Sequence, residues 1–241
     1  MFRWTDEMIA FMKDAAAAGS YQKELSAWIC EKLPQAGHVC DAGCGLGFLS
    51  LQLAAQYPEV TAADISDQAL AVLREQAEAQ NLSNLHILQI DLLHDTPPMV
   101  FDAMVFCLFG HMDEVLRIAK RCCRGRVVVI KKAFSHHRFS FSSVPLKDEQ
   151  TDQAAQYLER LGIPFELETR TFEMGQPLRS LDAAVRFFEV YSKDAPGTLT
   201  KDLVAQRLVH TDDARFPFYL PQSKALGRFT IQTKDIPEEF L

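Results

Sequence analysis

Short apolar segments alternate with amphipathic ones between positions 38 and 132. Five segments are nearly continuously apolar and end at turn residues, which predicts buried strands at 38–43, 59–66, 85–91, 101–109 and 124–132. Three segments between them have apolar residues at helical spacing, which predicts helices at 48–57, 67–81 and 111–123. Strands that alternate with helices favour an α/β fold with a parallel sheet covered on both faces. Right-handed crossovers make such a sheet doubly wound, with its ligand crevice at the carboxyl ends of the strands.

The pattern changes on both sides of this alternation. Two helices are predicted before it, at 5–17 and 21–33. The segments predicted after it are a loop at 133–146, a helix at 147–162, a strand at 164–172 and a last strand at 225–233. Residues 173–223 separate the last two strands, with helices expected around 181–191 and 200–209. This stretch is too long for a hairpin loop, so we interpret it as an insertion.

We therefore predict one domain over residues 1–241, made of four parts. Residues 1–33 form an N-terminal helical lid, 34–172 the core, 173–223 a helical insertion that acts as a substrate lid, and 224–241 the last strand and tail. With 241 residues, of which 48% are hydrophobic, the chain is long enough to bury one large core.

Charge and cysteine usage exclude several classes of partner. The net charge of −7 argues against a nucleic-acid or membrane partner held by a broad basic face. There is no run of about 18 apolar residues, and the first fourteen residues lack the apolar centre of a secretory signal. No pair of cysteines has C-x-x-C spacing. We therefore expect reduced thiols rather than a disulfide framework, and we expect no zinc site. We expect a cytoplasmic protein without a bound metal.

The most informative motif is VCDAGCGLGFLS at 39–50, which joins the first predicted strand of the sheet to a helix. Its glycines let the backbone approach a ligand closely, and the helix offers free N–H groups. A dinucleotide loop would need glycine where Phe48 stands, and a P-loop would need Gly-Lys-Ser/Thr, which is absent. The remaining pattern, Asp-x-Gly-x-Gly-x-Gly from Asp41 to Gly47, resembles the first motif of class I S-adenosylmethionine-dependent methyltransferases.

Later segments extend this resemblance over roughly residues 20–132. In that family an acid at the end of the second strand binds both ribose hydroxyls, a role that falls here on Asp64. A further acid after the third strand meets the adenine amino group, and Asp91 stands there, followed by Leu92 with its backbone N–H and apolar side chain. The resemblance implies S-adenosyl-L-methionine as the cofactor and a seven-stranded, mostly parallel sheet whose last strand is antiparallel. The cofactor-binding residues that it implies are Asp41, Gly43, Cys44, Gly45, Gly47, Asp64, Ile65, Asp91, Leu92 and Cys107.

Other roles stay open for the acids. Asp41 either anchors the loop or meets the methionine part of the cofactor. Asp64 would alternatively cap the next helix, and Asp91 would alternatively be a plain surface acid. Asp102 opens its strand, far from the ligand edge, and we expect a structural role for it.

The acceptor side should follow the fourth and fifth strands. His111 has the placement of a general base, or it caps the helix that it precedes. Five basic residues could bind an anionic acceptor such as a carboxylate, or lie in a solvated loop: Lys131, Lys132, His136, His137 and Arg138. There is no Asn-Pro-Pro-Tyr, which disfavours amino methylation of DNA bases or glutamine, and no carboxylate cluster for magnesium.

We therefore expect methyl transfer to a small-molecule acceptor, on nitrogen or oxygen. One alternative is a protein of the same fold that binds the cofactor without transferring its methyl group. A nicotinamide-dependent oxidoreductase is the other, and the glycine spacing disfavours it.

Overall fold

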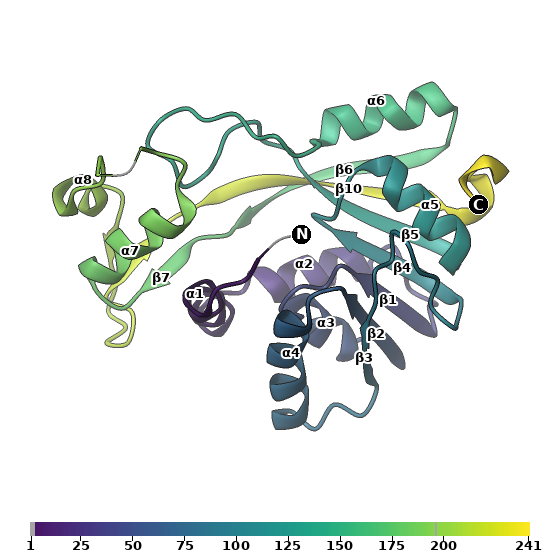
Figure 1. Cartoon of the computed structure of the whole chain (residues 1–241), viewed down its shortest axis with the longest axis horizontal. Helices are drawn as coiled ribbons and strands as arrows, with labels where there is room; N and C mark the ends of the chain where they lie inside the picture. Colours follow the sequence, from purple (N-terminus) through teal and green to yellow (C-terminus); the bar gives the residue numbers. More distant parts are fainter. Residues whose placement is uncertain (1–2, 196) are drawn as a thin grey trace. The chain divides into compact units, whose positions relative to one another are not determined.

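The computed structural model describes residues 3–195 and 197–241 of the chain, and its main feature is a seven-stranded sheet (Figure 1). The strand order is β3-β2-β1-β4-β5-β10-β6. The strands are β1 (His38–Ala42), β2 (Glu59–Asp64), β3 (Leu85–Gln89), β4 (Phe101–Cys107), β5 (Cys123–Lys132), β6 (Phe165–Glu173) and β10 (Ser223–Gln232). The pairs among β1 to β5 are parallel, whereas β10 pairs antiparallel with β5. The predicted fold class is confirmed, including its antiparallel last strand.

Helices cover both faces of this sheet. They are α2 (Tyr21–Cys30), α3 (Phe48–Ala54), α4 (Asp67–Ala79), α5 (Met112–Cys122) and α6 (Thr151–Leu161). Figure 1 shows α3 and α4 on one face and α5 and α6 on the other. The reversal of strand order between β1 and β4 places the crevice of the doubly wound fold at their carboxyl ends.

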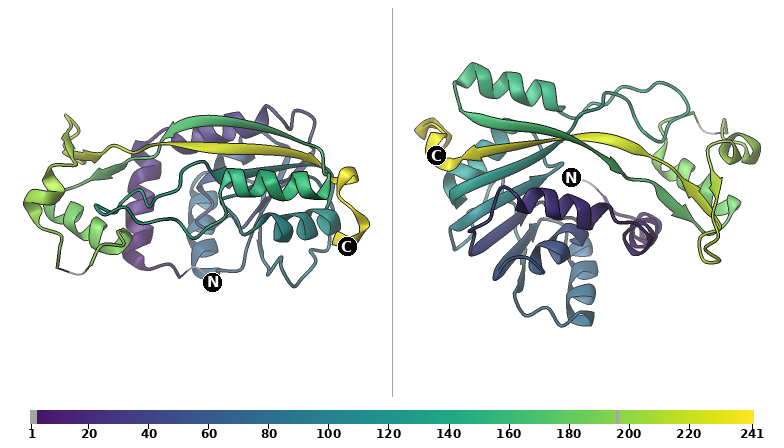
Figure 2. Two further views of the ribbon diagram at one scale, coloured as in Figure 1. Left: turned by 90° about the horizontal axis from the view of Figure 1, so that it is seen from above. Right: turned by 180° about the vertical axis from the view of Figure 1, so that it is seen from behind.

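The chain divides into two compact units. The larger, here called the sheet unit, consists of Gln22–Ala133, Asp148–Arg170 and Ala225–Leu241. The smaller, here called the aromatic unit, consists of Met1–Tyr21, Phe134–Lys147 and Thr171–Lys224. The strands β6 and β10, which lie side by side in both views of Figure 2, contribute residues to each unit.

The aromatic unit has a core and a small sheet of its own. Its elements are α1 (Asp6–Ala18), α7 (Leu181–Tyr191), α8 (Lys201–Ala205) and a sheet of order β7-β9-β8, from Gln176–Leu178, Phe218–Leu220 and Val209–His210. Phe139, Phe187 and Phe188 are at most 5% exposed and form its centre. The helices α1 and α7 agree with the predicted ones. The three-stranded sheet was not predicted, and α8 ends earlier than the predicted helix.

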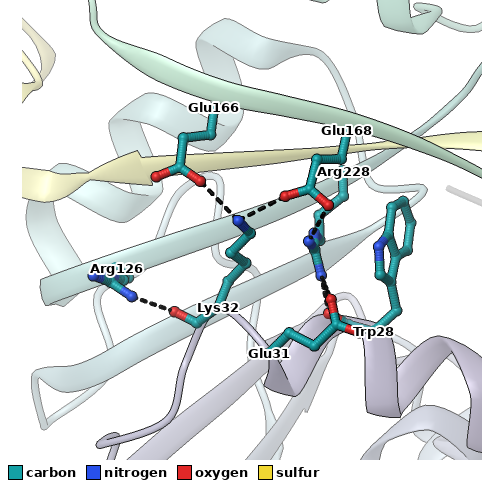
Figure 3. A network of polar contacts seen from close by, with 7 residues as sticks. All are labelled: Trp28, Glu31, Lys32, Arg126, Glu166, Glu168 and Arg228. Atoms are coloured by element: carbon teal, nitrogen blue, oxygen red, sulfur yellow. Dashed lines mark hydrogen bonds and ion pairs between the residues drawn. The ribbon is translucent and has the colours of Figure 1, made fainter.

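A polar network fastens the end of α2 to the strands β6 and β10 of the sheet unit (Figure 3). Arg228 is 1% exposed, stacks 4.6 Å from the centroid of the Trp28 ring, and donates to the carbonyl of Trp28. Its guanidinium also reaches Glu168 at 2.7 Å, and Lys32 binds the same carboxylate at 2.6 Å. Because these bonds join Trp28 and the segment after α2 to two strands, the network ties this end of α2 to the sheet.

Candidate functional site

The glycine loop between β1 and α3 has a backbone that side chains would disrupt. Gly43 has φ +71° and Gly47 has φ +74°, both in the left-handed region. A Cβ at position 43 would lie 2.3 Å from Cδ2 of Phe109, and one at position 47 would lie 2.4 Å from Cδ1 of Leu73. The amide of Gly43 donates to the carbonyl of Ala63 at 2.8 Å, which ties the loop to the end of β2. These two glycines are therefore required by the conformation and by close packing.

Asp64 ends β2 and is bonded directly to this loop. Its Oδ2 accepts from the amide of Gly45 at 2.8 Å, and its Oδ1 accepts from the amide of Ser66 at 2.8 Å. The N-cap of α4 is Ser66, whose hydroxyl accepts from Ala69, so Asp64 does not have that role. Each carboxylate oxygen keeps a lone pair for a further donor, and the side chain is only partly buried.

Asp41 is a buried acid behind the loop. It is 1% exposed, and the hydroxyl of Ser50 on α3 donates to its Oδ2 at 2.6 Å. Burial raises the pKa of Asp41 to about 6, the Ser50 bond opposes this rise, and the charge of Asp64 adds to it. The bond to α3 gives Asp41 the anchoring role that the sequence left open.

Asp91 and Leu92 follow β3. Oδ1 of Asp91 accepts from the amide of Leu93 at 3.0 Å, and Oδ2 contacts Nδ1 of His94 at 2.9 Å. The His94 bond is the main reason that the pKa of Asp91 is lowered. Leu92 is 4% exposed, and its carbonyl accepts from Arg121 at 2.8 Å. Asp91 thus holds a turn, and only its remaining lone pairs can meet a ligand.

Three further predicted residues lie near these acids. Cys44 follows Gly43, and Cys107 ends β4; burial is the first cause that raises the pKa of both thiols, and the charge of Asp41 adds to it. These sulfurs are therefore neutral, and neither is an activated nucleophile. Ile65 is exposed directly after Asp64.

The loop after β4 has a constrained backbone. Leu108 has φ +55°, which is uncommon for a residue with a side chain, and Gly110 has φ +33°. The ring of Phe109 packs edge-on to Phe106, with centroids 5.5 Å apart, and lies against Gly43. The β4 loop is thus in contact with the glycine loop.

Lys131 holds this loop from β5. It is 2% exposed, and its Nζ donates to the carbonyls of Phe109 at 3.1 Å and Gly110 at 2.6 Å. It also lies 2.8 Å from Glu149, whose side chain is 11% exposed and accepts from the amide of Met112. The anion-binding role considered for Lys131 is therefore wrong, because its hydrogens are already bonded within the protein. Glu149 was missed because nothing in its sequence surroundings distinguishes it from a surface acid.

The remaining basic candidates separate between the two units. Lys132, in the sheet unit, pairs with Asp148. In the aromatic unit, Nδ1 of His136 contacts Ser135 at 2.9 Å, and Nδ1 of His137 contacts Ser140 at 3.2 Å. Arg138 also belongs to the aromatic unit.

His111 lies at the N-cap of α5. Its amide donates to Oε2 of Glu114 at 2.8 Å, and its side chain is exposed. The capping position is the alternative that the sequence offered, and the ring is exposed at the start of α5, on the predicted acceptor side.

Asp102 has the structural role predicted for it. Its Oδ2 accepts from the amides of Gly37 and His38 at 3.0 and 2.9 Å, and its Oδ1 accepts from Nε of Arg124 at 2.8 Å. Arg124 is the main reason that the pKa of Asp102 is lowered. Over residues 3–195 and 197–241, no three His, Cys, Asp or Glu side chains form a group that could hold a metal ion.

Comparison with known proteins agrees with this geometry. The sequence model of a family described as "Methyltransferase domain" matches residues 39–127, which contain the glycine loop, Asp64, Asp91 and β4. The match covers 89 of the 241 residues, and this part of the chain is similar to that family of methyltransferase domains. A curated relative, the ubiquinone biosynthesis O-methyltransferase of Idiomarina loihiensis, is 35% identical over 90 residues, which are 36% of this chain and 37% of that protein. The chain thus matches about a third of the length of its curated relatives.

Two solved structures show the same methyltransferase fold. Coclaurine N-methyltransferase, bound to N-methylheliamine and SAH, is 16% identical with a TM-score of 0.56, over 92% of this chain and 81% of that one. The [4+2]-cyclase SpnF is 14% identical with a TM-score of 0.54, over 93% of each chain. At these identities the likeness concerns the fold, and activity has to be argued from the site.

Proposed function

We propose that this protein binds S-adenosyl-L-methionine and transfers its methyl group to nitrogen or oxygen of a small-molecule acceptor. The observation that carries the proposal is Asp64, a partly exposed carboxylate fastened to the Gly45 amide beside a loop that tolerates no side chain at Gly43 or Gly47. A carboxylate can accept two vicinal ribose hydroxyls at once. Residues 39–127, where the family model matches, contain the whole arrangement.

The chain's own residues have modest tasks in this reaction. The cofactor supplies a methyl group that is already activated on a sulfonium. The protein has to hold donor and acceptor in line, about 3 Å apart, in a site that excludes water. The glycine loop and Asp64 position the donor, Leu92 supplies an apolar wall, and the β4 loop held by Lys131 forms the acceptor side. Because the six cysteines are free thiols, we place the reaction in the reducing cytoplasm.

Replacing Asp64 tests the donor site. Asp64→Ala should weaken binding of S-adenosylhomocysteine by about 1–3 kcal/mol, because charge-assisted hydrogen bonds to the ribose are lost. Isothermal titration calorimetry measures the change. Asp67→Ala is the matched control, since Asp67 lies three residues later, is exposed and pairs with Arg74. An unchanged affinity in Asp64→Ala would refute the ribose assignment.

Replacing His111 tests the acceptor side. His111→Ala should lower methyl turnover by about a hundredfold or more, because a general base at the substrate is lost, and should leave cofactor affinity unchanged. Transfer of labelled methyl groups, followed with an acceptor found by screening, measures the rate. His86→Ala, on β3, is the control because His86 contacts Glu59 on the neighbouring strand. Full turnover in His111→Ala removes this residue from the mechanism.

A second candidate function is cofactor binding without methyl transfer. SpnF, whose fold this chain shares, is described as a [4+2]-cyclase, so the fold by itself does not require methyl transfer. The two candidates agree on the donor site and differ in turnover. Formation of S-adenosylhomocysteine in the presence of acceptors supports methyl transfer, whereas binding without its formation across a broad acceptor panel supports the second candidate.

A further inference from the structure

The aromatic unit contains a partly buried arginine that has no carboxylate partner. Nη1 of Arg138 donates to the carbonyl of Met174 at 3.0 Å, and the guanidinium stacks 4.2 Å from the centroid of the Phe139 ring. No ion pair to Arg138 is found in the described part of the chain, residues 3–195 and 197–241. The planar guanidinium keeps donors on its other nitrogens.

The acid whose charge acts on Arg138 is already occupied. Glu173 accepts at one oxygen from the hydroxyl of Tyr219 at 2.9 Å and from the amide of Gln222 at 2.7 Å. Its other oxygen accepts from the hydroxyl of Ser223 at 2.6 Å. Both oxygens of Glu173 therefore bind groups at the strand ends. The guanidinium of Arg138 has no carboxylate that accepts from two of its nitrogens.

A desolvated cation without a partner is costly to the fold. Burial is the first cause that lowers the pKa of Arg138, and Glu173 is the carboxylate whose charge opposes this effect. An incoming anion would restore the lost stabilisation, and groups with this imbalance are concentrated at binding sites.

The backbone that presents Arg138 is clamped from one side by a second arginine. Arg207 donates to three successive carbonyls, those of Arg138 at 3.0 Å, Phe139 at 3.4 Å and Ser140 at 3.2 Å. Its guanidinium also stacks on Phe188, 5.2 Å from the ring centroid. All hydrogen bonds of Arg207 in the described residues go to carbonyls, so its task is to shape this segment.

An acid clamps the following residues. Asp194 accepts from the amides of Phe141 at 2.8 Å and Ser142 at 2.9 Å, and the amide of Lys193 donates to the hydroxyl of Ser140 at 2.8 Å. The segment 138–142 is thus fixed by bonds along its length.

The surroundings of the guanidinium are aromatic. The ring of Tyr191 lies 5.8 Å from that of Phe139, and the ring of Tyr21 packs edge-on to Phe172 at 5.9 Å. Burial raises the pKa of Tyr191 to about 12, so its hydroxyl is neutral and cannot serve as a counterion for Arg138. A cation beside apolar rings suits a ligand that joins an anionic head to an apolar body.

We propose that Arg138 binds the carboxylate of a small organic acid with an apolar or aromatic body, at a site within the aromatic unit. This inference goes beyond the proposed function and does not depend on it. Arginine is the side chain best matched to a carboxylate, since two parallel N–H groups reach both oxygens.

The test uses the full chain and matched probes. Benzoate and 3-phenylpropionate are compared with benzamide and 3-phenylpropionamide by ligand-observed NMR, which needs no turnover. The wild type should bind at least one acid about tenfold more tightly than its amide, and Arg138→Gln should abolish the difference. Arg215→Gln is the matched control, because Arg215 is an exposed guanidinium over Phe216 in the same unit and pairs with Asp213. Arg138→Lys keeps the positive charge but lacks the two parallel N–H groups of the guanidinium, so its preference for acids over amides should be weaker. This variant replaces Arg138→Gln if the latter does not fold.

Three results would each overturn the inference. They are equal binding of acids and amides by the wild type, no binding of either acid, and an unchanged preference for acids in both Arg138 variants. Titration with S-adenosylhomocysteine is run in parallel on the same samples. Cofactor binding without any preference for acids refutes the Arg138 site alone, whereas loss of cofactor binding in the wild type refutes the proposed function.

Discussion

Lys131→Met should lower the free energy of unfolding by about 3–5 kcal/mol. The substitution removes one member of a buried ion pair and leaves the carboxylate of Glu149, 11% exposed, without its cation. It also removes the donor for the carbonyls of Phe109 and Gly110, which belong to a loop with positive φ at Leu108 and Gly110. Urea denaturation followed by circular dichroism measures the change.

The neighbouring lysine is a matched control. Lys132 pairs with Asp148, whose side chain is 63% exposed, so Lys132→Met should cost less than about 1 kcal/mol. The double variant Lys131→Met with Glu149→Met should recover part of the loss, because no buried charge then stays unpaired. Equal costs at positions 131 and 132 would show that burial of the pair does not matter.

The two lysines also show why part of the site could not be predicted. Residues 127–130 before them are buried on both faces of the sheet, so no alternation in the sequence tells which lysine points inward. The partner of Lys131 is 18 positions later, in an irregular segment without a pattern. The sequence therefore indicated a basic cluster, and only the folded chain separates Lys131, which has a carboxylate partner, from Arg138, for which the described residues show none.

The sheet was predictable because its strands are long, apolar and separated by helices with clear periodicity. The position of Asp64 at the end of the second strand was also predictable, because this acid follows directly after an apolar segment. The small sheet of the aromatic unit was not, because β7, β8 and β9 have only two or three residues each, and alternation is recognised only over about four residues or more. Phe109 was missed as a neighbour of Gly43 because the two residues meet only through the pairing of β1 with β4.

Asp41→Asn should change the pH dependence of stability. Burial raises the pKa of Asp41 from 3.8 to about 6, so the folded chain holds a proton that the unfolded chain has released between these two values. The resulting stabilisation is complete below pH 3.8 and is lost as the pH rises through about 6. The loss amounts to about 3 kcal/mol, taking about 1.4 kcal/mol for each pH unit.

The amide of the variant does not titrate and can still accept from the Ser50 hydroxyl, so Asp41→Asn should gain about 3 kcal/mol relative to the wild type between pH 4 and pH 8. Urea denaturation of both proteins across this range measures the difference between their free energies of unfolding. Other groups titrate in both proteins, so their contributions cancel in this difference. Asp67→Asn replaces an acid whose side chain is 66% exposed, and its difference from the wild type should be nearly constant. A constant difference for Asp41→Asn as well would show that this carboxylate titrates as it does in water. The glycine loop would then rest on a charged anchor at every pH in this range.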